Sequence, residues 1–249
     1  MRLSRPSPRI IGFAGIAILA TAIAAVGGCA GGTTRPINNV PRPPTLLPRS
    51  SASRIQPSLG APCLSDDPDA LCLGVKVIAY ANPATGIPTL EATDVIRDMQ
   101  NVNSVWSQCR IGFQVDNYSS VDPARHKLNF DTAESDDLTK IRNNFSTDKS
   151  LLLVSTGAWN RHGSLGRTPA NAWTAMPGSG LYGAIIEQPV VTTPNMVAHE
   201  LGHYLNLQHI DDATDLMNPV IYPTSGVLTA EQCDTARSAA TTYWSKMLR

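Results

Sequence analysis

One short segment, AHELGHYLNLQHI at residues 198–210, constrains the fold of this chain more than any other. It contains three of the five histidines found among 249 residues. In a helix, His199 and His203 are four residues apart and project from the same face, so both imidazoles can reach one cation. A catalytic zinc site takes three protein ligands and keeps one position for water, so the third ligand must come from beyond these helical turns. His209 is the candidate.

A helix break has to precede His209 if its side chain is to turn back toward the other two histidines. Asn206 stands at that point, and asparagine tolerates the left-handed conformation that ends helices better than most other non-glycine residues. Thr193 and Pro194 predict the start of the helix, as its N-cap and its first helical residue. Met217, in the sequence DLMNP, predicts a tight turn that passes beneath the imidazoles.

This constellation resembles the metzincins, which are zinc endopeptidases with the motif HExxHxxGxxH and a following methionine turn. The short interval between the third histidine and the methionine is similar to that of the matrixin branch. The sequence HYLNLQH resembles the corresponding segment of the pappalysin-like enzymes. The resemblance implies an α+β fold of the zincin-like (metzincin) class: a twisted mixed sheet with a backing helix, an active-site helix and a C-terminal helix. The matching residues are His199, Glu200, His203, His209 and Met217, with Asn206 where the family has glycine.

The same resemblance implies a role for each residue of the motif. The three histidines would hold one catalytic Zn²⁺, and Glu200 would be the general base that takes a proton from the zinc-activated water and passes it to the leaving amine. The alternative is a metal-free histidine cluster in which Glu200 is an ordinary helix residue. By resemblance, the specificity pocket would be lined by Val220, Ile221 and Tyr222.

The sequence gives no support for a structural calcium ion or a second zinc ion. The acidic residues at 66–69 lack a full ladder of calcium ligands. His126 and His162 are isolated in the sequence. The aspartates that follow the third histidine are candidates for a hydrogen bond to a metal-binding imidazole, and the alternative for each is a residue without a role at the metal. They are Asp211, Asp212 and Asp215.

The N-terminus predicts export and lipid anchoring. Arg2, Arg5 and Arg9 precede an uncharged apolar run over residues 10–29, as in an export signal. The run ends in VGGC, which resembles a bacterial lipobox, so residues 1–28 are predicted to be a signal peptide and Cys29 to be acylated. The protein would then lie in the cell envelope, outside the cytoplasm, with its lipid in the outer membrane or at the cell surface. The alternative is a plain transmembrane anchor.

Residues 29–60 are rich in proline, serine and threonine, and they predict a tether between the lipid and the folded domain. The alternative is that part of this segment packs on the domain as an N-terminal arm. Residues 61–249 are within the usual size of one domain and are assigned to a single metzincin-like catalytic domain.

Four cysteines remain after the lipidation site, and an even number in an exported chain predicts two disulfides with three possible pairings. Pairing Cys63 with Cys72 closes a short loop and is favoured, which leaves Cys109 with Cys233. No pair has CxxC spacing, so a cysteine zinc cluster is not expected. The chain has 20 basic and 20 acidic side chains. It therefore lacks the excess of basic residues that is typical of nucleic-acid-binding proteins, and no nucleic-acid partner is expected.

Periodicity predicts the remaining elements of the domain. The helix at 89–109 presents an apolar face at offsets of three and four, and the run SLLLVS has the composition of a strand buried on both faces. Thr229 and Gln232 have the spacing of a capping box. The expected order is strand 72–80, helix 89–109, strand 110–116, helix 136–145, strand 150–155, loop 157–180, strand 181–187, active-site helix, and a last helix within 228–248.

These features favour a zinc-dependent endopeptidase that hydrolyses peptide bonds in extracytoplasmic proteins, with proteins or peptides as its substrates. One alternative is a non-proteolytic zinc-binding lipoprotein of the envelope, acting as an adhesin or an assembly factor. Another is a metallohydrolase with a substrate other than protein. The enzyme is favoured because Glu200 is present, and a binding module does not require a general base.

Overall fold

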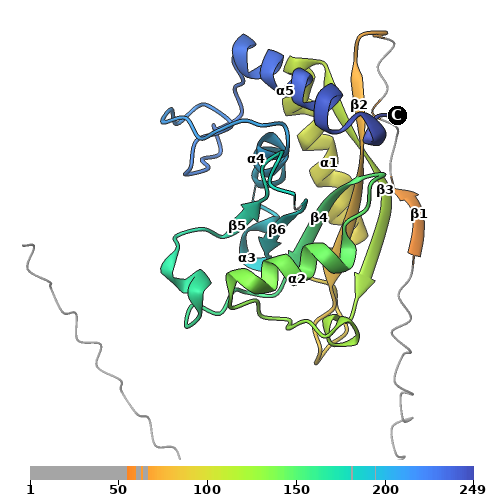
Figure 1. Cartoon of the computed structure of the whole chain (residues 1–249), viewed down its shortest axis with the longest axis vertical. Helices are drawn as coiled ribbons and strands as arrows, with labels where there is room; N and C mark the ends of the chain where they lie inside the picture. The colour runs from red at the N-terminus through yellow and green to blue at the C-terminus, as the bar shows by residue number, and fades with distance from the viewer. Residues whose placement is uncertain (1–54, 60–62, 64–66, 181, 194) are drawn as a thin grey trace, which may run out of the picture. The chain divides into compact units, whose positions relative to one another are not determined.

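The computed structural model describes residues 55–59, 63, 67–180, 182–193 and 195–249. The predicted signal peptide, Cys29 and most of the predicted tether lie outside these residues. A mixed sheet runs through the described part, with helices on both of its faces (Figure 1). No helix in these ranges is long and apolar enough to cross a membrane.

The sheet has six strands in the order β1-β3-β2-β4-β6-β5. The four inner strands are parallel to one another, and the two edge strands, β1 and β5, run antiparallel to their neighbours. Parallel strands need long crossover connections. Helix α1 lies in the connection from β2 to its neighbour β3, and α2 lies in the connection from β3 to β4, which pairs with the other side of β2. The strands are β1 Ile55–Leu59, β2 Leu71–Tyr80, β3 Ile111–Val121, β4 Leu151–Thr156, β5 Ala172–Thr174 and β6 Ala184–Glu187.

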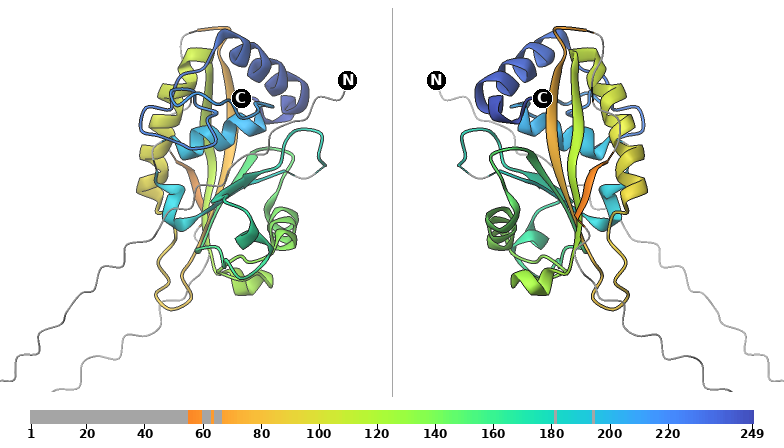
Figure 2. Two further views of the ribbon diagram at one scale, coloured as in Figure 1. Left: turned by 90° about the vertical axis from the view of Figure 1, so that its left-hand side faces the viewer. Right: turned by 90° about the vertical axis from the view of Figure 1, so that its right-hand side faces the viewer.

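The α-helices that the described residues form beside the sheet are α1 Ala92–Trp106, α2 Ser135–Phe145, α3 Gln188–Val191, α4 Met196–Tyr204 and α5 Ala230–Tyr243. Helices α1, α4 and α5 pack on one face and α2 packs on the other; α1 and α2 lie on opposite sides of the strands in Figure 2. The residues of β4 alternate between the two cores, since Leu153 belongs to the first and Leu152 to the second. The predicted α+β class is therefore confirmed.

Several local predictions agree with the structure. Helix α1 buries Val95, Met99, Val102 and Trp106, which lie on the predicted apolar face. All six residues of β4 are buried, as expected for a strand covered on both faces. Helix α5 begins with the predicted capping box, in which Thr229 and Gln232 exchange side chain to backbone hydrogen bonds.

Two strands lie outside the strands expected from periodicity. Strand β1 lies at the end of the predicted tether and pairs with β3, as in the alternative in which part of this segment packs on the domain as an N-terminal arm. Its Pro57 is compatible with an edge strand, where a missing backbone donor is tolerated. Strand β5 lies inside the predicted loop 157–180 and has three residues, which is too short for a periodic signal. Strand β6 begins at Ala184, after the predicted start at 181.

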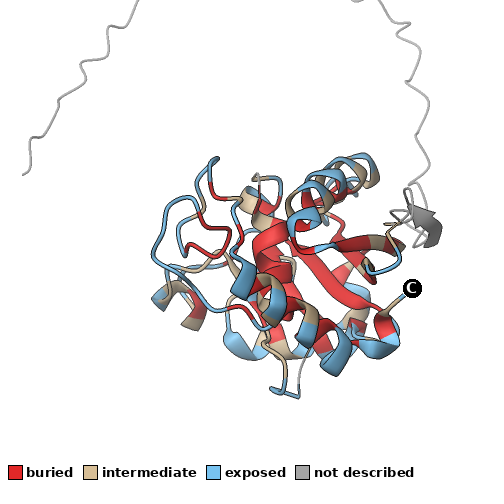
Figure 3. Ribbon diagram, turned by 90° about the horizontal axis from the view of Figure 1, so that it is seen from above, coloured by how far each residue is buried: buried red, intermediate tan, exposed pale blue. Residues whose placement is uncertain are grey.

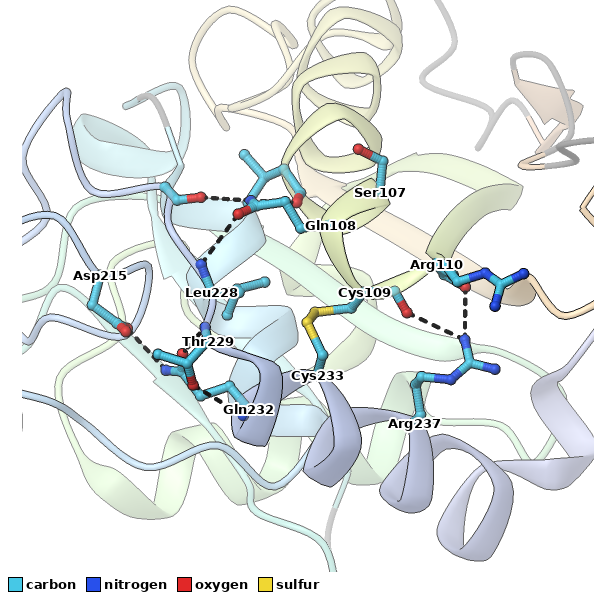
Figure 4. The surroundings of a disulfide bond; sticks show 12 residues. Ser107, Gln108, Cys109, Arg110, Asp215, Leu228, Thr229, Gln232, Cys233 and Arg237 are labelled. Carbon is cyan, nitrogen blue, oxygen red and sulfur yellow. Dashed lines mark hydrogen bonds between the residues drawn. A yellow bond between two sulfur atoms is a disulfide. The ribbon is translucent and has the colours of Figure 1, made fainter.

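The structure forms both disulfides that the sequence favours, Cys63–Cys72 and Cys109–Cys233. The second joins the short helical turn after α1 to α5, across 124 residues of sequence (Figure 4). It therefore links the backing helix to the C-terminal helix.

Candidate metal centre

Helix α4 carries the first two histidines and is buried along most of its length. Figure 3 shows buried residues concentrated in the sheet and in the helix packed at its centre. The helix begins at Met196, so the predicted start at Thr193 and Pro194 is wrong by about one half-turn. Thr193 instead accepts a backbone hydrogen bond from Met196 N at 3.2 Å, while Pro194 lies outside the described residues.

Asn195 replaces the predicted cap and explains the later start. Its backbone is left-handed, with φ of 65°, and its side chain makes no capping bond. The side chain is used in tertiary contacts instead: Nδ2 donates to Ser225 O at 2.6 Å, and Oδ1 accepts from Asn101 Nδ2 at 2.9 Å. Asn195 thus joins the start of α4 both to α1 and to the loop after the methionine.

The structure brings the three predicted histidines together. His199, His203 and His209 each offer one ligand atom, and these atoms lie within 4.8 Å of one another. His199 is buried and His209 is exposed, so the cluster opens to the surface on the side of His209. Asn206 has φ of 66°, the left-handed conformation predicted for the residue that turns the chain back toward the cluster.

Backbone carbonyls orient two of the three rings. His199 Nδ1 lies 2.7 Å from Leu216 O, and His203 Nδ1 lies 2.9 Å from Leu207 O. A carbonyl can only accept, so each Nδ1 carries the proton and each Nε2 keeps its lone pair for a cation. His203 Nε2 lies 3.1 Å from His209 Nε2. Two nitrogens bound to one tetrahedral zinc lie about 3.4 Å apart, so this spacing fits a shared zinc ion.

Burial keeps the imidazoles neutral. Desolvation lowers the pKa of His199 to about 4, although its hydrogen bond to Leu216 acts in the opposite direction. Desolvation also lowers the pKa of His203 and of His209. Metal binding requires neutral histidine, so few protons have to be displaced near neutral pH.

The predicted role of the aspartates is wrong. Asp215 Oδ1 accepts from Met217 N at 2.7 Å and from Gln232 Nε2 at 3.0 Å. Asp212 bonds within its own turn, and Asp211 is exposed. Backbone carbonyls hold the imidazoles instead, and a carbonyl leaves no trace in a sequence motif.

Met217 packs against the helix that carries the first two histidines. It is fully buried, and its backbone oxygen accepts from Ile210 N at 3.0 Å. A Cβ added to Gly202 would lie 2.4 Å from Met217 Sδ, so the methionine packs directly against a helical glycine. Gly202 was not identified from the sequence as a contact of Met217. The available signal was a glycine inside a helix, which usually reflects close packing.

Glu200 is buried beside the cluster and hydrogen bonds to an edge strand. Its Oε2 accepts from Thr174 Oγ1 of β5 at 2.5 Å. Desolvation raises the pKa of Glu200 to about 7, while the Thr174 hydrogen bond and the charge of Arg142 lower it. Thr174 and Arg142 were not identified from the sequence, because neither lies in a recognisable motif.

Among the described residues, strand β5 forms one edge of the sheet, and its Thr174 contacts Glu200. Glu187 N donates to Asn171 O, and Ala175 N donates to Gly183 O, so residues 171, 173 and 175 face β6. Antiparallel strands alternate in this respect, and the backbone groups of Ala172 and Thr174 therefore face away from β6.

The chain around the methionine is tied to two helices (Figure 4). Gln108, just after α1, donates through Nε2 to Gly226 O at 2.8 Å and accepts at Oε1 from Leu228 N at 3.3 Å. Gln232 of α5 bonds Asp215, beside the disulfide at Cys233. The floor of the site is thus fixed to both α1 and α5.

The residues predicted to line a specificity pocket lie on the segment that follows this floor. Val220 is 56% exposed and Tyr222 is 44% exposed, whereas Ile221 is half-buried. Their role in specificity stays a prediction.

Comparison with known proteins gives distant structural likenesses. No protein-family model matches the chain, and no curated protein matches it. Metalloproteinase-II from Bacteroides fragilis is similar with a TM-score of 0.48 and 19% identity, over 74% of this chain and 57% of that one. The chain thus spans little more than half the length of that protein. Archaemetzincin from Methanopyrus kandleri is similar with a TM-score of 0.45 and 12% identity, over 68% of this chain and 96% of that one. Both TM-scores are below 0.5, so the assignment of a metal site rests on the geometry of the three histidines.

Proposed function

We propose that this chain is a zinc-dependent endopeptidase of the metzincin type that hydrolyses peptide bonds in extracytoplasmic proteins. The observation that carries the proposal is the convergence of His199, His203 and His209, whose ligand atoms lie within 4.8 Å of one another, beside the buried Glu200. The turn at Asn206 and the methionine floor support the metzincin assignment, and the short interval between His209 and Met217 supports the matrixin branch.

The donor set fits zinc. Three neutral imidazoles are typical ligands of a catalytic zinc ion, which keeps a further position open for water. When bound, zinc lowers the pKa of its water to about 7 and polarises the scissile carbonyl. His199 and His203 are held for this task by Leu216 O and Leu207 O, and exposed His209 completes the set from the solvent side.

Glu200 is the residue that moves the proton. Thr174 occupies Oε2, which leaves Oε1 to receive a proton and later release it to the leaving amine. Burial raises the pKa of Glu200 in the metal-free protein, and a carboxyl group can both accept a proton and release it. Thr174 is accordingly a positioning residue for the base.

The open edge of β5 supports an extended peptide as the substrate. The backbone groups of Ala172 and Thr174 face away from β6 and can pair with a peptide that adds to the sheet as a further strand. Main-chain pairing of this kind places few demands on sequence. We assign side-chain preference to the exposed segment with Val220, Ile221 and Tyr222, whose character favours apolar substrate residues.

The cellular setting is part of the proposal. The export signal and the lipobox ending at Cys29 support a lipid anchor in the cell envelope, and two disulfides suit an oxidising compartment outside the cytoplasm. The substrates are then proteins or peptides in that compartment.

The test uses the full chain. Zinc content is measured by elemental analysis, and cleavage of fluorescently labelled casein is followed with and without a chelator. We expect one zinc per chain, cleavage that the chelator abolishes, and zinc retention without cleavage in Glu200→Gln. His209→Ala should weaken zinc binding itself, and Glu231→Gln, on the surface of α5, serves as the matched control.

The other outcomes separate the alternatives. One zinc without cleavage of casein or a panel of peptides would favour the non-proteolytic binding lipoprotein. Absence of zinc binding, or full cleavage by Glu200→Gln, would refute the proposal.

A further inference from the structure

Arg142 is a buried cation that the chemistry described above does not use. It lies on α2, on the opposite face of the sheet from α4, and is only 5% exposed. Its guanidinium donates from Nε to Gly183 O at 3.0 Å and from Nη2 to Trp173 O at 2.8 Å. Both acceptors are backbone atoms of the β5–β6 hairpin, one on each side of its turn.

Stability alone does not account for this arrangement. Burying a guanidinium is costly, and an apolar side chain of similar volume often packs at least as well. Within the described ranges, Arg142 forms no ion pair with a carboxylate. Desolvation lowers the pKa of Arg142. In this buried site the guanidinium is compensated by the two backbone carbonyl dipoles to which it donates.

The hairpin is shaped to admit this side chain. Gly183 has φ of 154°, and a Cβ at this position would lie 2.8 Å from Arg142 Cγ. Any larger residue would displace the stem of the arginine, so Gly183 and Arg142 form a matched pair. The planar guanidinium then reaches two carbonyls at once, which an ammonium group cannot do with the same geometry.

Strand β5 needs such support because it has three residues and, within the part of the chain that the structure describes, pairs with β6 alone. A strand this short gains little from its own ladder of hydrogen bonds. Trp173, whose carbonyl Arg142 holds, directly precedes Thr174, whose hydroxyl holds Glu200. A displacement of β5 would therefore move both the open edge and the partner of the base.

We propose that Arg142 is a positioning residue that fixes β5 as the peptide-receiving edge and keeps Thr174 against Glu200. The part of this proposal that concerns peptides rests on the proposed function. The hydrogen bonds from Arg142 of α2 to the β5–β6 hairpin do not depend on catalysis, and their effect on the hairpin can be measured without it.

The experiment compares the full-length, zinc-loaded chain with Arg142→Met and Arg142→Lys. Lys140→Met is the matched control, because Lys140 lies on the same helix with an exposed side chain. Hydrogen–deuterium exchange of residues 171–187 reports the hairpin, and exchange of residues 196–204 reports α4. For each variant we also measure the zinc affinity, the free energy of unfolding, and kcat and KM on labelled casein.

We expect hairpin exchange in Arg142→Met to rise about tenfold while exchange of α4 and zinc affinity stay at wild-type values. KM should rise about tenfold, with a smaller fall in kcat, because peptide pairing is lost before the metal site is affected. Arg142→Lys keeps the charge but loses the planar group that donates to both carbonyls. Its KM should lie between those of Arg142→Met and the wild type. Lys140→Met should match the wild type.

Unchanged hairpin exchange in Arg142→Met would overturn the proposal. So would faster exchange throughout the domain with a lower free energy of unfolding, since that pattern describes a purely structural role. If the wild type binds zinc and cleaves nothing, the proposed function fails, and hairpin exchange alone decides whether Arg142 holds the strand.

Discussion

Gln232 of α5 donates from Nε2 to Asp215 Oδ1 at 3.0 Å, and both side chains are buried. The same carboxylate oxygen accepts from Met217 N at 2.7 Å. Leu216 lies between Asp215 and Met217 in the chain, and its carbonyl oxygen is 2.7 Å from His199 Nδ1. One side chain of the C-terminal helix is thus connected to a metal-binding imidazole through the backbone of the methionine turn.

Replacing Gln232 with glutamate should weaken zinc binding without removing the helix cap. Glutamate also forms the capping box, but it cannot donate to Asp215 and places two carboxylates side by side. We expect zinc affinity to fall about tenfold, as measured by competition with a chelator. Glu231→Gln, at the neighbouring exposed position, should have no effect, and wild-type affinity in Gln232→Glu would show that Gln232 is only a cap.

Glu200→Gln should stabilise the metal-free protein at alkaline pH. The pKa of Glu200 is raised from its ordinary value of 4.5 to about 7 in the folded, metal-free state, so its contribution to stability is complete below about pH 4.5 and is lost progressively as the pH rises to about 7. At pH 8 the variant should gain about 3 kcal/mol, since one pKa unit corresponds to about 1.4 kcal/mol.

Urea unfolding of chelator-treated protein between pH 5 and pH 8 measures this difference. The histidine contributions run in the opposite direction, because the pKa of His199 is lowered to about 4, but they cancel between the two proteins. A difference that does not decrease toward pH 5 would contradict the assignment.

Gly202→Ala should destabilise the protein by about 1–3 kcal/mol, because the new methyl group overlaps Met217 Sδ. Truncating the methionine in the double variant with Met217→Ala should recover part of this loss, which a double-mutant cycle in urea would quantify. Gly226→Ala is the control, since an added Cβ there meets Asn195 Nδ2 at an ordinary 3.6 Å. Strict additivity would mean that the two residues do not touch.

Removing the disulfide between Cys109 and Cys233 should cost more stability than removing the one between Cys63 and Cys72. The sequence separations are 124 and 9 residues, and a longer closed loop restricts the unfolded chain more strongly. The chain-entropy relation gives about 5 kcal/mol for the first and about 3 kcal/mol for the second. Paired Cys→Ser variants, compared by their free energies of unfolding, check the order.

The sequence predicts the parts of the site that depend on local spacing. His199, His203, Asn206 and Met217 are recognisable because helix geometry, a left-handed turn and a motif act within a few residues. The capping box of α5 and the apolar stripe of α1 are local in the same sense. These elements are found in the structure where the sequence places them.

The remaining contacts could not be predicted because they join segments that are distant in the chain. Thr174 meets Glu200 across 26 residues, and Arg142 meets Gly183 across 41. Asn195 shows how tertiary contacts override a local preference: its bonds to Asn101 and Ser225 hold a left-handed residue where Thr193 and Pro194 predict the helix start.

The carbonyls of Leu216 and Leu207 orient His199 and His203, and this choice of acceptor affects how the centre tolerates mutation. A main-chain oxygen persists whatever side chain the residue carries, so substitutions at these leucines can change packing while both ring orientations are kept. A point mutation at Leu216 or Leu207 therefore leaves the hydrogen bond that orients the imidazole in place. Evolution could vary the substrate-facing surface extensively, provided that the backbone path set by Asn206 and Asp215 is preserved.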